Sequence, residues 1–373
     1  MRLLLLHDDN ERESPTCRAL RWDGRLVGTL HTNQHGEKQF VYDAAWLRDE
    51  DAPPLSLSLP KRDVPFKRRE CRPFFAGLLA EDLQRDAVAH ALGVSRGNDF
   101  ALLDARGGDV AGALMLLPDG TAPPESHSDI PSRPLDDAAL VAILDRLPSR
   151  PLPAGQDGLR LSLAGAQSKL PVVLVEGRVA LPAPGQPTTH ILKPPIARFP
   201  GTTENEALVM QLAAACGLPT ARAEARAVAQ RLYLLVERYD RRVDDQGRVR
   251  RLHQEDTCQA LVIVPEHKYA AEGGPTFPAM FALLRRATQQ PALAVLAFLD
   301  AAIFNVIAGN ADAHGKNFSL LHAGGATLAP FYDLLCTLAY PDLSPRFAMK
   351  VGGHGLRSRR RVLSHLARCA LLR

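Results

Sequence analysis

One short polar run carries the residues best suited to chemistry. Residues 309–318 read Gly-Asn-Ala-Asp-Ala-His-Gly-Lys-Asn-Phe and directly follow a long apolar stretch. An Asp can accept the proton of a hydroxyl group, and an Asn can offer its amide oxygen to a divalent cation. Asp312 and Asn317 therefore indicate a site for phosphoryl transfer, although polar runs of this kind are also common in solvent-exposed loops.

A second carboxylate follows at a suitable distance. Asp312 and Asn317 have the spacing of the Asp and Asn in the catalytic loop of protein kinases, and Asp333 comes sixteen residues after Asn317. Kinases place a second Mg²⁺-binding Asp in this region. The local residues are Tyr-Asp-Leu and not Asp-Phe-Gly, so a simple turn residue is the alternative. Asn317 and Asp333 together suit Mg²⁺, which uses few protein ligands.

A cation for the ATP phosphates is expected upstream. Lys193 ends a β-prone segment, residues 189–193, although a solvated residue at a strand end is equally compatible with the pattern. Glu206 would orient Lys193, or it would cap its own helix as the partner of Thr203 in a capping box. Lys316 would lie near the transferred phosphate.

The phosphate-covering loop has no familiar signature. The chain contains neither G-x-x-x-x-G-K-[ST] nor G-x-G-x-x-G, which argues against P-loop and Rossmann nucleotide sites. Residues 161–170 read Leu-Ser-Leu-Ala-Gly-Ala-Gln-Ser-Lys-Leu instead. Small residues here would let backbone N–H groups approach a phosphate, and a plain hairpin turn is the alternative.

The surrounding pattern predicts a β-rich half followed by an α-rich half. Strands are expected at 25–32, 38–42, 159–163, 170–176 and 190–193, with one bent strand or two strands over 227–237. Helices are expected at 74–92, 136–147, 203–216 and 291–308, with glycine caps at 93, 217 and 309. This order is typical of a two-lobed enzyme with a cleft between its lobes.

Composition narrows the class. The 373 residues are 46% hydrophobic, and neither a signal peptide nor a membrane-spanning run is expected, so we predict a soluble, cytoplasmic protein. Six scattered cysteines without a C-x-x-C pair disfavour a zinc module or disulfides. Eight basic and no acidic residues lie in 343–373, leaving the first 342 residues with a net charge of −4. The basic run 357–361 would contact DNA phosphates or form a solvated end of a helix.

The ordered motifs together resemble the HipA family of serine/threonine kinases. They lie at residues 162–169, 189–193, 236–242, 254–259, 309–317, 330–333 and 348–350, with 55–60 and 73–79 matching the extra N-terminal domain of that family. The resemblance spans roughly residues 20 to 365. It implies an α+β fold of two kinase-like lobes, with a small β-rich N-terminal domain added and a mostly helical C-terminal lobe that looks shortened at Arg373.

The resemblance also implies a role for each matching residue. Asp312 would be the catalytic base, Asn317 and Asp333 the Mg²⁺ ligands, Glu206 a supporting residue, and Ser162 the autophosphorylation site. Residues implied to bind ATP are Ala164, Gly165, Ala166, Gln167, Ser168, Lys169, Lys193, Glu237, Arg238, Tyr239, His314, Gly315, Lys316, Asn317, Tyr332 and Asp333. Gln254, Glu255 and Asp256 are expected to brace the junction between the lobes without a catalytic role.

The expected domains are 1–150 (N-terminal), 151–245 (N-lobe) and 246–373 (C-lobe). Family members are usually toxins that phosphorylate a protein, in one case an aminoacyl-tRNA synthetase. They pair with a helix-turn-helix antitoxin of HipB type that binds operator DNA, and no membrane contact is expected. The alternatives are a small-molecule kinase of similar architecture and an inactive relative that serves only as a binding module in an antitoxin complex on DNA.

Overall fold

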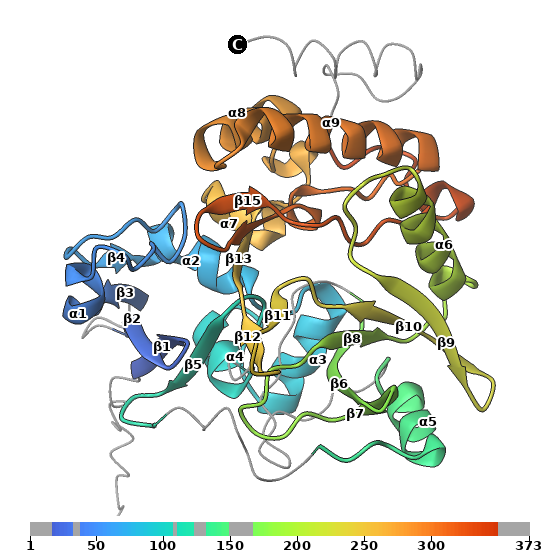
Figure 1. The fold of residues 1–373 in the computed structure, drawn as a ribbon, viewed down its shortest axis with the longest axis horizontal. Coiled ribbons are helices and arrows are strands. Elements are labelled where there is room, and N and C mark those ends of the chain that lie inside the picture. Colours follow the sequence, from blue (N-terminus) through green and yellow to red (C-terminus); the bar gives the residue numbers. More distant parts are fainter. Residues whose placement is uncertain (1–16, 33–37, 107–109, 123–131, 149–166, 350–373) are drawn as a thin grey trace, which may run out of the picture.

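Two antiparallel sheets and a helical part make up the protein. The computed structural model describes residues 17–32, 38–106, 110–122, 132–148 and 167–349. Figure 1 shows the N-terminal sheet at the left, the second sheet at the lower right and helices α8 and α9 across the top. The segment 159–163, the loop residues 162–166 and the basic tail from residue 350 lie outside the described residues.

The first sheet organises the N-terminal part around an apolar core. Its strand order is β4-β3-β2-β1-β5, and the predicted pairing of 25–32 with 38–42 is confirmed. The strands are β1 (Cys17–Trp22), β2 (Arg25–Thr32), β3 (Lys38–Tyr42), β4 (Phe66–Lys67) and β5 (Leu114–Pro118), and the helices α1 (Ala44–Arg48), α2 (Arg68–Gly77), α3 (Asp82–Leu92) and α4 (Asp99–Arg106). Phe40, Phe66 and Phe74 are fully buried in this core.

The single helix predicted over 74–92 is wrong, because the chain breaks it in two. Helix α2 ends at Gly77 and α3 begins at Asp82, with Gly93 as the expected left-handed cap. Leu78 and Leu79 between the helices are buried in the N-terminal core, so the apolar periodicity continues across the break. The break brings Glu81 into the cleft described below.

The second sheet has the order β7-β6-β8-β10-β9 and carries two helices. Its strands are β6 (Leu170–Val175), β7 (Arg178–Ala180), β8 (His190–Lys193), β9 (Ala223–Val228) and β10 (Arg231–Glu237), and its helices are α5 (Asp137–Arg146) and α6 (Thr202–Ala215). Ala229 and Gln230 turn the chain with positive φ angles, so 227–237 holds two strands and not one bent strand. Helix α5 precedes the predicted domain boundary near 150, yet Leu140, Ile143 and Leu144 pack in the core of this sheet.

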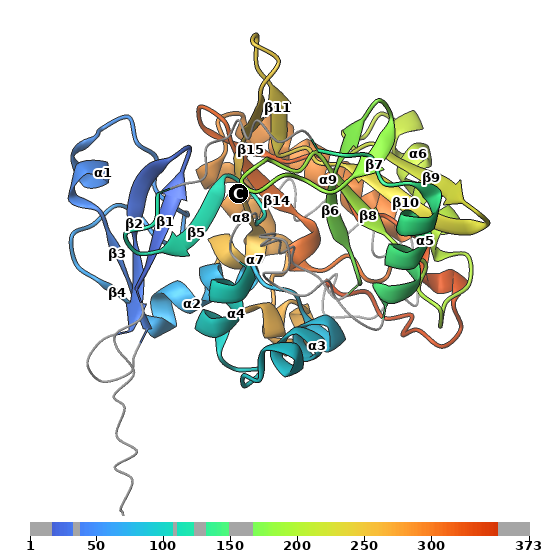
Figure 2. The same cartoon turned by 90° about the horizontal axis from the view of Figure 1, so that it is seen from below.

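The helical part surrounds a small three-stranded sheet. Its elements are β11 (Arg241–Val243), β12 (Val249–Arg251), β13 (His253–Asp256), β14 (Ser319–His322) and β15 (Ala326–Leu328), with α7 (Thr257–Ala260), α8 (Phe277–Ala287), α9 (Pro291–Ala308) and the short 3₁₀ turns η2 (Pro265–His267), η3 (Ala270–Glu272), η4 (Gly315–Asn317) and η5 (Thr337–Ala339). In Figure 2 the hairpin of β11 and β12 projects from the body. Gly309 ends α9 in the left-handed conformation, as predicted.

Helix α9 corrects one expectation from the sequence. It has 18 residues and a mean hydropathy of 2.0, so by length and composition it could cross a membrane. The prediction that no run qualifies is therefore wrong. Phe298, Ala301 and Ala302 are buried and pack with α8 in the core of the helical part, which explains the apolar composition without a membrane.

Candidate functional site

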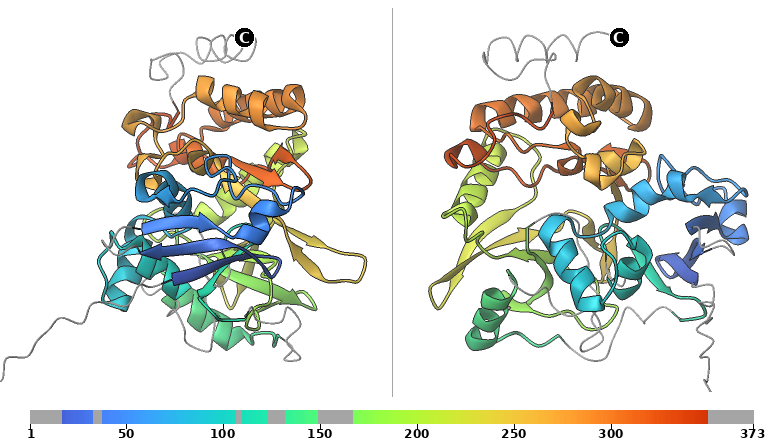
Figure 3. Two further views of the ribbon diagram at one scale, coloured as in Figure 1. Left: turned by 90° about the vertical axis from the view of Figure 1, so that its left-hand side faces the viewer. Right: turned by 180° about the vertical axis from the view of Figure 1, so that it is seen from behind.

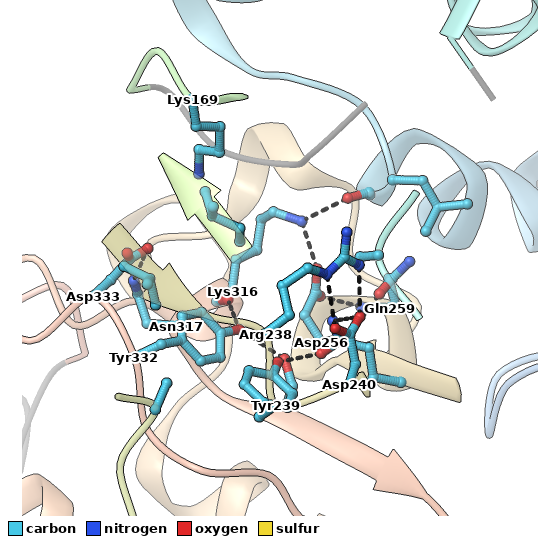
Figure 4. A pocket seen from close by; sticks show the side chains of 18 of the residues that line it. Lys169, Arg238, Tyr239, Asp240, Asp256, Gln259, Lys316, Asn317, Tyr332 and Asp333 are labelled. Atoms are coloured by element: carbon cyan, nitrogen blue, oxygen red, sulfur yellow. Dashed lines mark hydrogen bonds and ion pairs between the residues drawn. The ribbon is translucent and has the colours of Figure 1, made fainter. Parts of the chain in front are cut away.

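The three parts meet at an open cleft whose empty space, including solvent at its mouth, is about 930 Å³. Figure 4 shows side chains next to the second sheet, such as Lys169 and Arg238, converging there with side chains of the helical part, such as Asp256 and Asp333. The lining includes Gly77, Leu78, Glu81, Lys169, Lys193, Glu237, Arg238, Tyr239, Asp240, Asp256, His314, Lys316, Asn317, Tyr332 and Asp333.

Lys193 lies between two carboxylates at the centre of the cleft. Its Nζ donates to Glu206 Oε1 at 2.7 Å and also to Asp333 Oδ1. Burial alone would lower the pKa of Lys193, but Asp333 and Glu206 outweigh it and raise the pKa above the usual lysine value. Lys193 therefore stays protonated and is buried, not solvated at a strand end.

Glu206 reaches Lys193 because helix α6 begins differently from the prediction. Gly201, with φ 76°, is the N-cap and makes no side-chain capping bond. The capping box of Thr203 and Glu206 is therefore wrong. Thr203 is buried inside the first turn, and the Glu206 side chain is turned toward the β8 strand end.

Asp333 and Asn317 face each other with oxygen-bearing side chains. Asn317 Nδ2 lies 3.4 Å from Asp333 Oδ2, and Asn317 Oδ1 accepts from the backbone N–H of His314 at 3.1 Å. Burial would raise the pKa of Asp333, but Lys193 and Lys169 outweigh it and hold the pKa well below the usual range. The charged Asp333 carboxylate fits Mg²⁺, which prefers oxygen ligands, whereas Asn317 turns its amide nitrogen toward Asp333 and its oxygen toward the His314 N–H.

Asp312 lies in the turn before η4 and is held by a neighbouring phenol. Tyr269 donates its hydroxyl to Asp312 Oδ1 at 2.8 Å, and the Tyr269 ring lies edge-on to His314 with centroids 5.2 Å apart. The Asp312 side chain is exposed, yet desolvation by the surrounding protein raises its pKa, while the bond from Tyr269 and the charge of Lys268 oppose the rise. A higher pKa makes the ionised carboxylate a stronger proton acceptor.

Lys316 is expected beside the transferred phosphate, but its contacts in the structure are with other protein groups. Its Nζ donates to Asp256 Oδ2 at 2.5 Å and to the Gly77 carbonyl at 3.1 Å. Lys316 is buried, and Asp256 raises its pKa against the effect of burial. Its ammonium group therefore ties residues 309–317 to β13 and to the N-terminal part, so this bond of Asp256 lies within the helical part and not across the two kinase-like lobes.

Residues 237–239, which are expected to bind ATP, form another part of the cleft wall. The backbone N–H groups of Glu237 and Arg238 donate to the carbonyls of Arg222 and Thr189, so both are already used within the sheet. The Arg238 side chain is buried and binds both carboxylate oxygens of Asp240, at 2.9 and 2.8 Å. The side chain and the backbone N–H of Arg238 therefore both have protein partners, and its contact with ATP stays a prediction.

The aromatic rings of Tyr239 and Tyr332 line the cleft next to residues 237–239. Tyr239 and Tyr332 stack with their centroids 5.6 Å apart and an interplanar angle of 25°. Tyr332 donates its hydroxyl to the Lys316 carbonyl at 2.7 Å. A flat apolar face next to polar backbone groups is suited to a planar base.

Only the end of the expected phosphate loop lies within the described residues. Gln167 donates to the Pro194 carbonyl at 3.1 Å, and Ser168 accepts from Gln84 at 2.8 Å. Burial lowers the pKa of Lys169, while Asp333 opposes the decrease. Ala164, Gly165, Ala166 and Ser162 lie outside the described residues, so the structure does not place them.

Three further residues, which no sequence pattern indicates, lie next to the predicted site residues. Glu81, Lys268 and Tyr269 contact the catalytic loop or each other. They lie far along the chain from residues 309–317 and follow no spacing pattern, so no local signal pointed to them.

Two domain families match the chain. Residues 161–371 match the HipA-like C-terminal domain and residues 19–117 the HipA N-terminal domain. A Sinorhizobium fredii protein named "Putative kinase Y4mE" is 63% identical over 89% of this chain and 80% of its own length. The Shewanella oneidensis "Serine/threonine-protein kinase toxin HipA" is 32% identical over 80% of this chain and 70% of its own length.

A solved structure shares the fold. The Shewanella oneidensis toxin–antitoxin complex of HipA, HipB and operator DNA superposes with a TM-score of 0.79 and 28% identity, over 94% of this chain and 88% of the other. The mixed α/β fold expected from the motifs is thereby confirmed. This chain belongs to the HipA family of kinase-like proteins.

Proposed function

We propose that the protein is an ATP- and Mg²⁺-dependent serine/threonine protein kinase. The observation that carries the proposal is the contact of the buried pair Lys193 and Glu206 with the half-buried Asp333 and Asn317, with Asp312 presented from the same loop as Asn317. Phosphoryl transfer depends mainly on positioning and charge stabilisation, and this set supplies both.

Each side chain has a distinct task in this mechanism. Lys193, fixed by Glu206, positions the ATP phosphates, and the stacked pair of Tyr239 and Tyr332 lies where a base can rest. Asp333 and Asn317 would hold Mg²⁺, which neutralises charge on the phosphates when bound. Asp312 accepts the proton of the attacking hydroxyl, and its raised pKa favours this transfer.

Autophosphorylation and a toxin role extend the proposal. Ser162 is the proposed acceptor in cis, because it belongs to the expected phosphate loop, where added charge would repel ATP phosphates. By its likeness to the HipA chain of the HipA, HipB and DNA complex, we propose a helix-turn-helix antitoxin as partner, with operator DNA reached through it. The proposed substrate is a cytoplasmic protein, and an aminoacyl-tRNA synthetase is one candidate.

The test is transfer of the γ-phosphate of ATP to protein by purified wild type and by Asp312→Asn. We expect labelled protein from the wild type and at least about a 100-fold lower rate from Asp312→Asn, because the proton acceptor is lost. Asp300→Asn, an exposed change on α9, serves as the matched control and should keep the wild-type rate. Labelling of a metabolite with no labelling of protein would instead indicate a small-molecule kinase.

A further inference from the structure

The N-terminal part reaches into the cleft at the break between α2 and α3. Gly77 ends α2, and Glu81 immediately precedes α3; both line the cleft with residues of the helical part. Figure 3, seen from behind, shows α3 lying between the N-terminal sheet and the second sheet. Gln84 on α3 donates to Ser168 at 2.8 Å, at the end of the expected phosphate loop.

Glu81 contacts two lysines of the helical part. Its Oε2 accepts from Lys268 Nζ at 2.6 Å, and its Oε1 lies 3.6 Å from Lys316 Nζ. The side chains of all three residues are at most 10% exposed. Within the described residues Glu81 Oε1 accepts no hydrogen bond, and it forms its ion pair with Lys316 at 3.6 Å.

Both lysines are direct neighbours of catalytic-loop contacts. Lys268 precedes Tyr269, whose hydroxyl binds Asp312, and the Lys268 carbonyl accepts from the N–H of Gly315 at 3.3 Å. Lys316 precedes Asn317. A carboxylate that fixes both ammonium groups therefore acts on both sides of the loop that presents the proton acceptor and the amide.

Ion pairs join the charges of this cluster. Glu81 pairs with Lys268 and Lys316, and Asp256 pairs with Lys316. Replacing Glu81 by a neutral isostere removes a carboxylate partner from each of two buried cations, and a buried charge that loses a partner drives side chains to rearrange. The pKa of Glu81 is held below its usual value because Lys316 and Lys268 outweigh burial, so Glu81 is an anion near neutral pH.

We propose that Glu81 is a positioning residue for phosphoryl transfer, through which the HipA N-terminal domain completes the catalytic centre. Glu81 contacts neither ATP nor the acceptor in this account. It holds Lys268 and Lys316, and these hold Asp312, by way of Tyr269, and Asn317 in place. The inference rests on the proposed kinase function.

The experiment compares Glu81→Gln with a matched control, Glu266→Gln. Glu266 also receives an ion pair from the N-terminal part, from Arg72 at 2.5 Å, but it lies at the surface and outside the cleft. For Glu81→Gln we expect kcat to fall about 10- to 100-fold while KM for ATP changes less than about threefold, because a shifted catalytic group costs rate and not uniform binding. Glu266→Gln should match the wild type in both constants.

Two outcomes would overturn the proposal: a wild-type kcat in Glu81→Gln, or a raised KM with kcat unchanged. If Glu81→Gln does not fold, Lys268→Met removes the same contact from the other side and should give the same fall in kcat. Hydrogen–deuterium exchange over residues 310–317 gives a readout that needs no activity. Faster exchange in Glu81→Gln than in Glu266→Gln supports the proposal even if the wild type transfers no phosphate, a result that would defeat only the proposed function.

Discussion

At the scale of single residues, the bond from Tyr269 to Asp312 sets the behaviour of the proposed base. Desolvation by the surrounding protein raises the pKa of the Asp312 carboxyl, and the Tyr269 hydroxyl opposes this rise because it stabilises the charged form. A base must be deprotonated to act, so activity is lost as the pH falls through the pKa of Asp312. The acid side of the pH–rate profile therefore reports on this contact.

Tyr269→Phe should move that acid limb to higher pH. The change removes a hydrogen bond to the carboxylate, so the pKa of Asp312 rises further above the usual Asp value of 3.8. The measurement is kcat/KM against pH for the wild type and the variant. Tyr233→Phe, in the core of the second sheet, is the control and should leave the limb in place. A limb at the wild-type position or at lower pH in Tyr269→Phe would contradict the account.

The sequence anticipated one side of this site better than the other. Asp312 and Asn317 share a local spacing, and the kinase order states where Lys193, Glu206 and Asp333 should lie. The structure brings Lys193, Glu206, Asp333 and Asn317 into contact, and Asp312 bonds to Tyr269 from the same loop as Asn317. Tyr269 and Glu81 had no such rule. Their contacts depend on how the loop that carries Tyr269 and the break between α2 and α3 pack in three dimensions. The periodicity of the sequence does not encode this packing.

At the scale of elements, helix α6 links the second sheet to the segment after Asp333. Glu206 binds Lys193 of β8, and the neighbouring Asn205 binds Cys336 on both sides of its amide: its Oδ1 accepts from the backbone N–H at 2.8 Å and its Nδ2 donates to the carbonyl at 3.0 Å. One helical turn thus fixes Lys193 and the segment after Asp333 relative to each other.

Asn205→Ala should destabilise the protein by about 1–3 kcal/mol, because two hydrogen bonds to Cys336 are lost and its backbone groups are left partly buried. The measurement is the free energy of unfolding from urea denaturation. Gln211→Ala lies on the exposed side of the same helix and should change stability by less than about 0.5 kcal/mol. Equal stability of the two variants would show that α6 is not anchored through Asn205.

The elements also show where sequence patterns stop being informative. The apolar run and its following glycine predicted α6 well, but the capping box failed because Glu206 has a stronger partner in Lys193 than in its own backbone. The break between α2 and α3 escaped prediction for a similar reason. Leu78 and Leu79 keep the apolar pattern while their backbone turns toward the cleft.

At the scale of the whole molecule, a buried carboxylate fastens the N-terminal part to the helical part. Glu255 on β13 accepts from Ser56, from the Leu57 N–H at 3.0 Å and from His322 at 2.9 Å. Residues 254–256 are expected to brace the junction between the two kinase-like lobes, but Glu255 braces a different junction. Its partner is the N-terminal segment 55–59 and not the second sheet.

Glu255→Ala should cost about 3–5 kcal/mol of folding free energy, because three partners, the buried Ser56 among them, lose a buried acceptor at once. Thermal and urea unfolding measure the loss, and Glu272→Ala, at an exposed position of the same part, is the control. A loss below about 1 kcal/mol would mean that the junction does not depend on this carboxylate.

The central claim is that the cleft transfers phosphate from ATP with Asp312 as base. The most direct measurement is the intact mass of the purified protein after incubation with Mg-ATP, followed by peptide mapping. The account predicts one added phosphate at Ser162 in the wild type and none in Asp312→Asn. An unmodified wild type, or a fully phosphorylated Asp312→Asn, would contradict it.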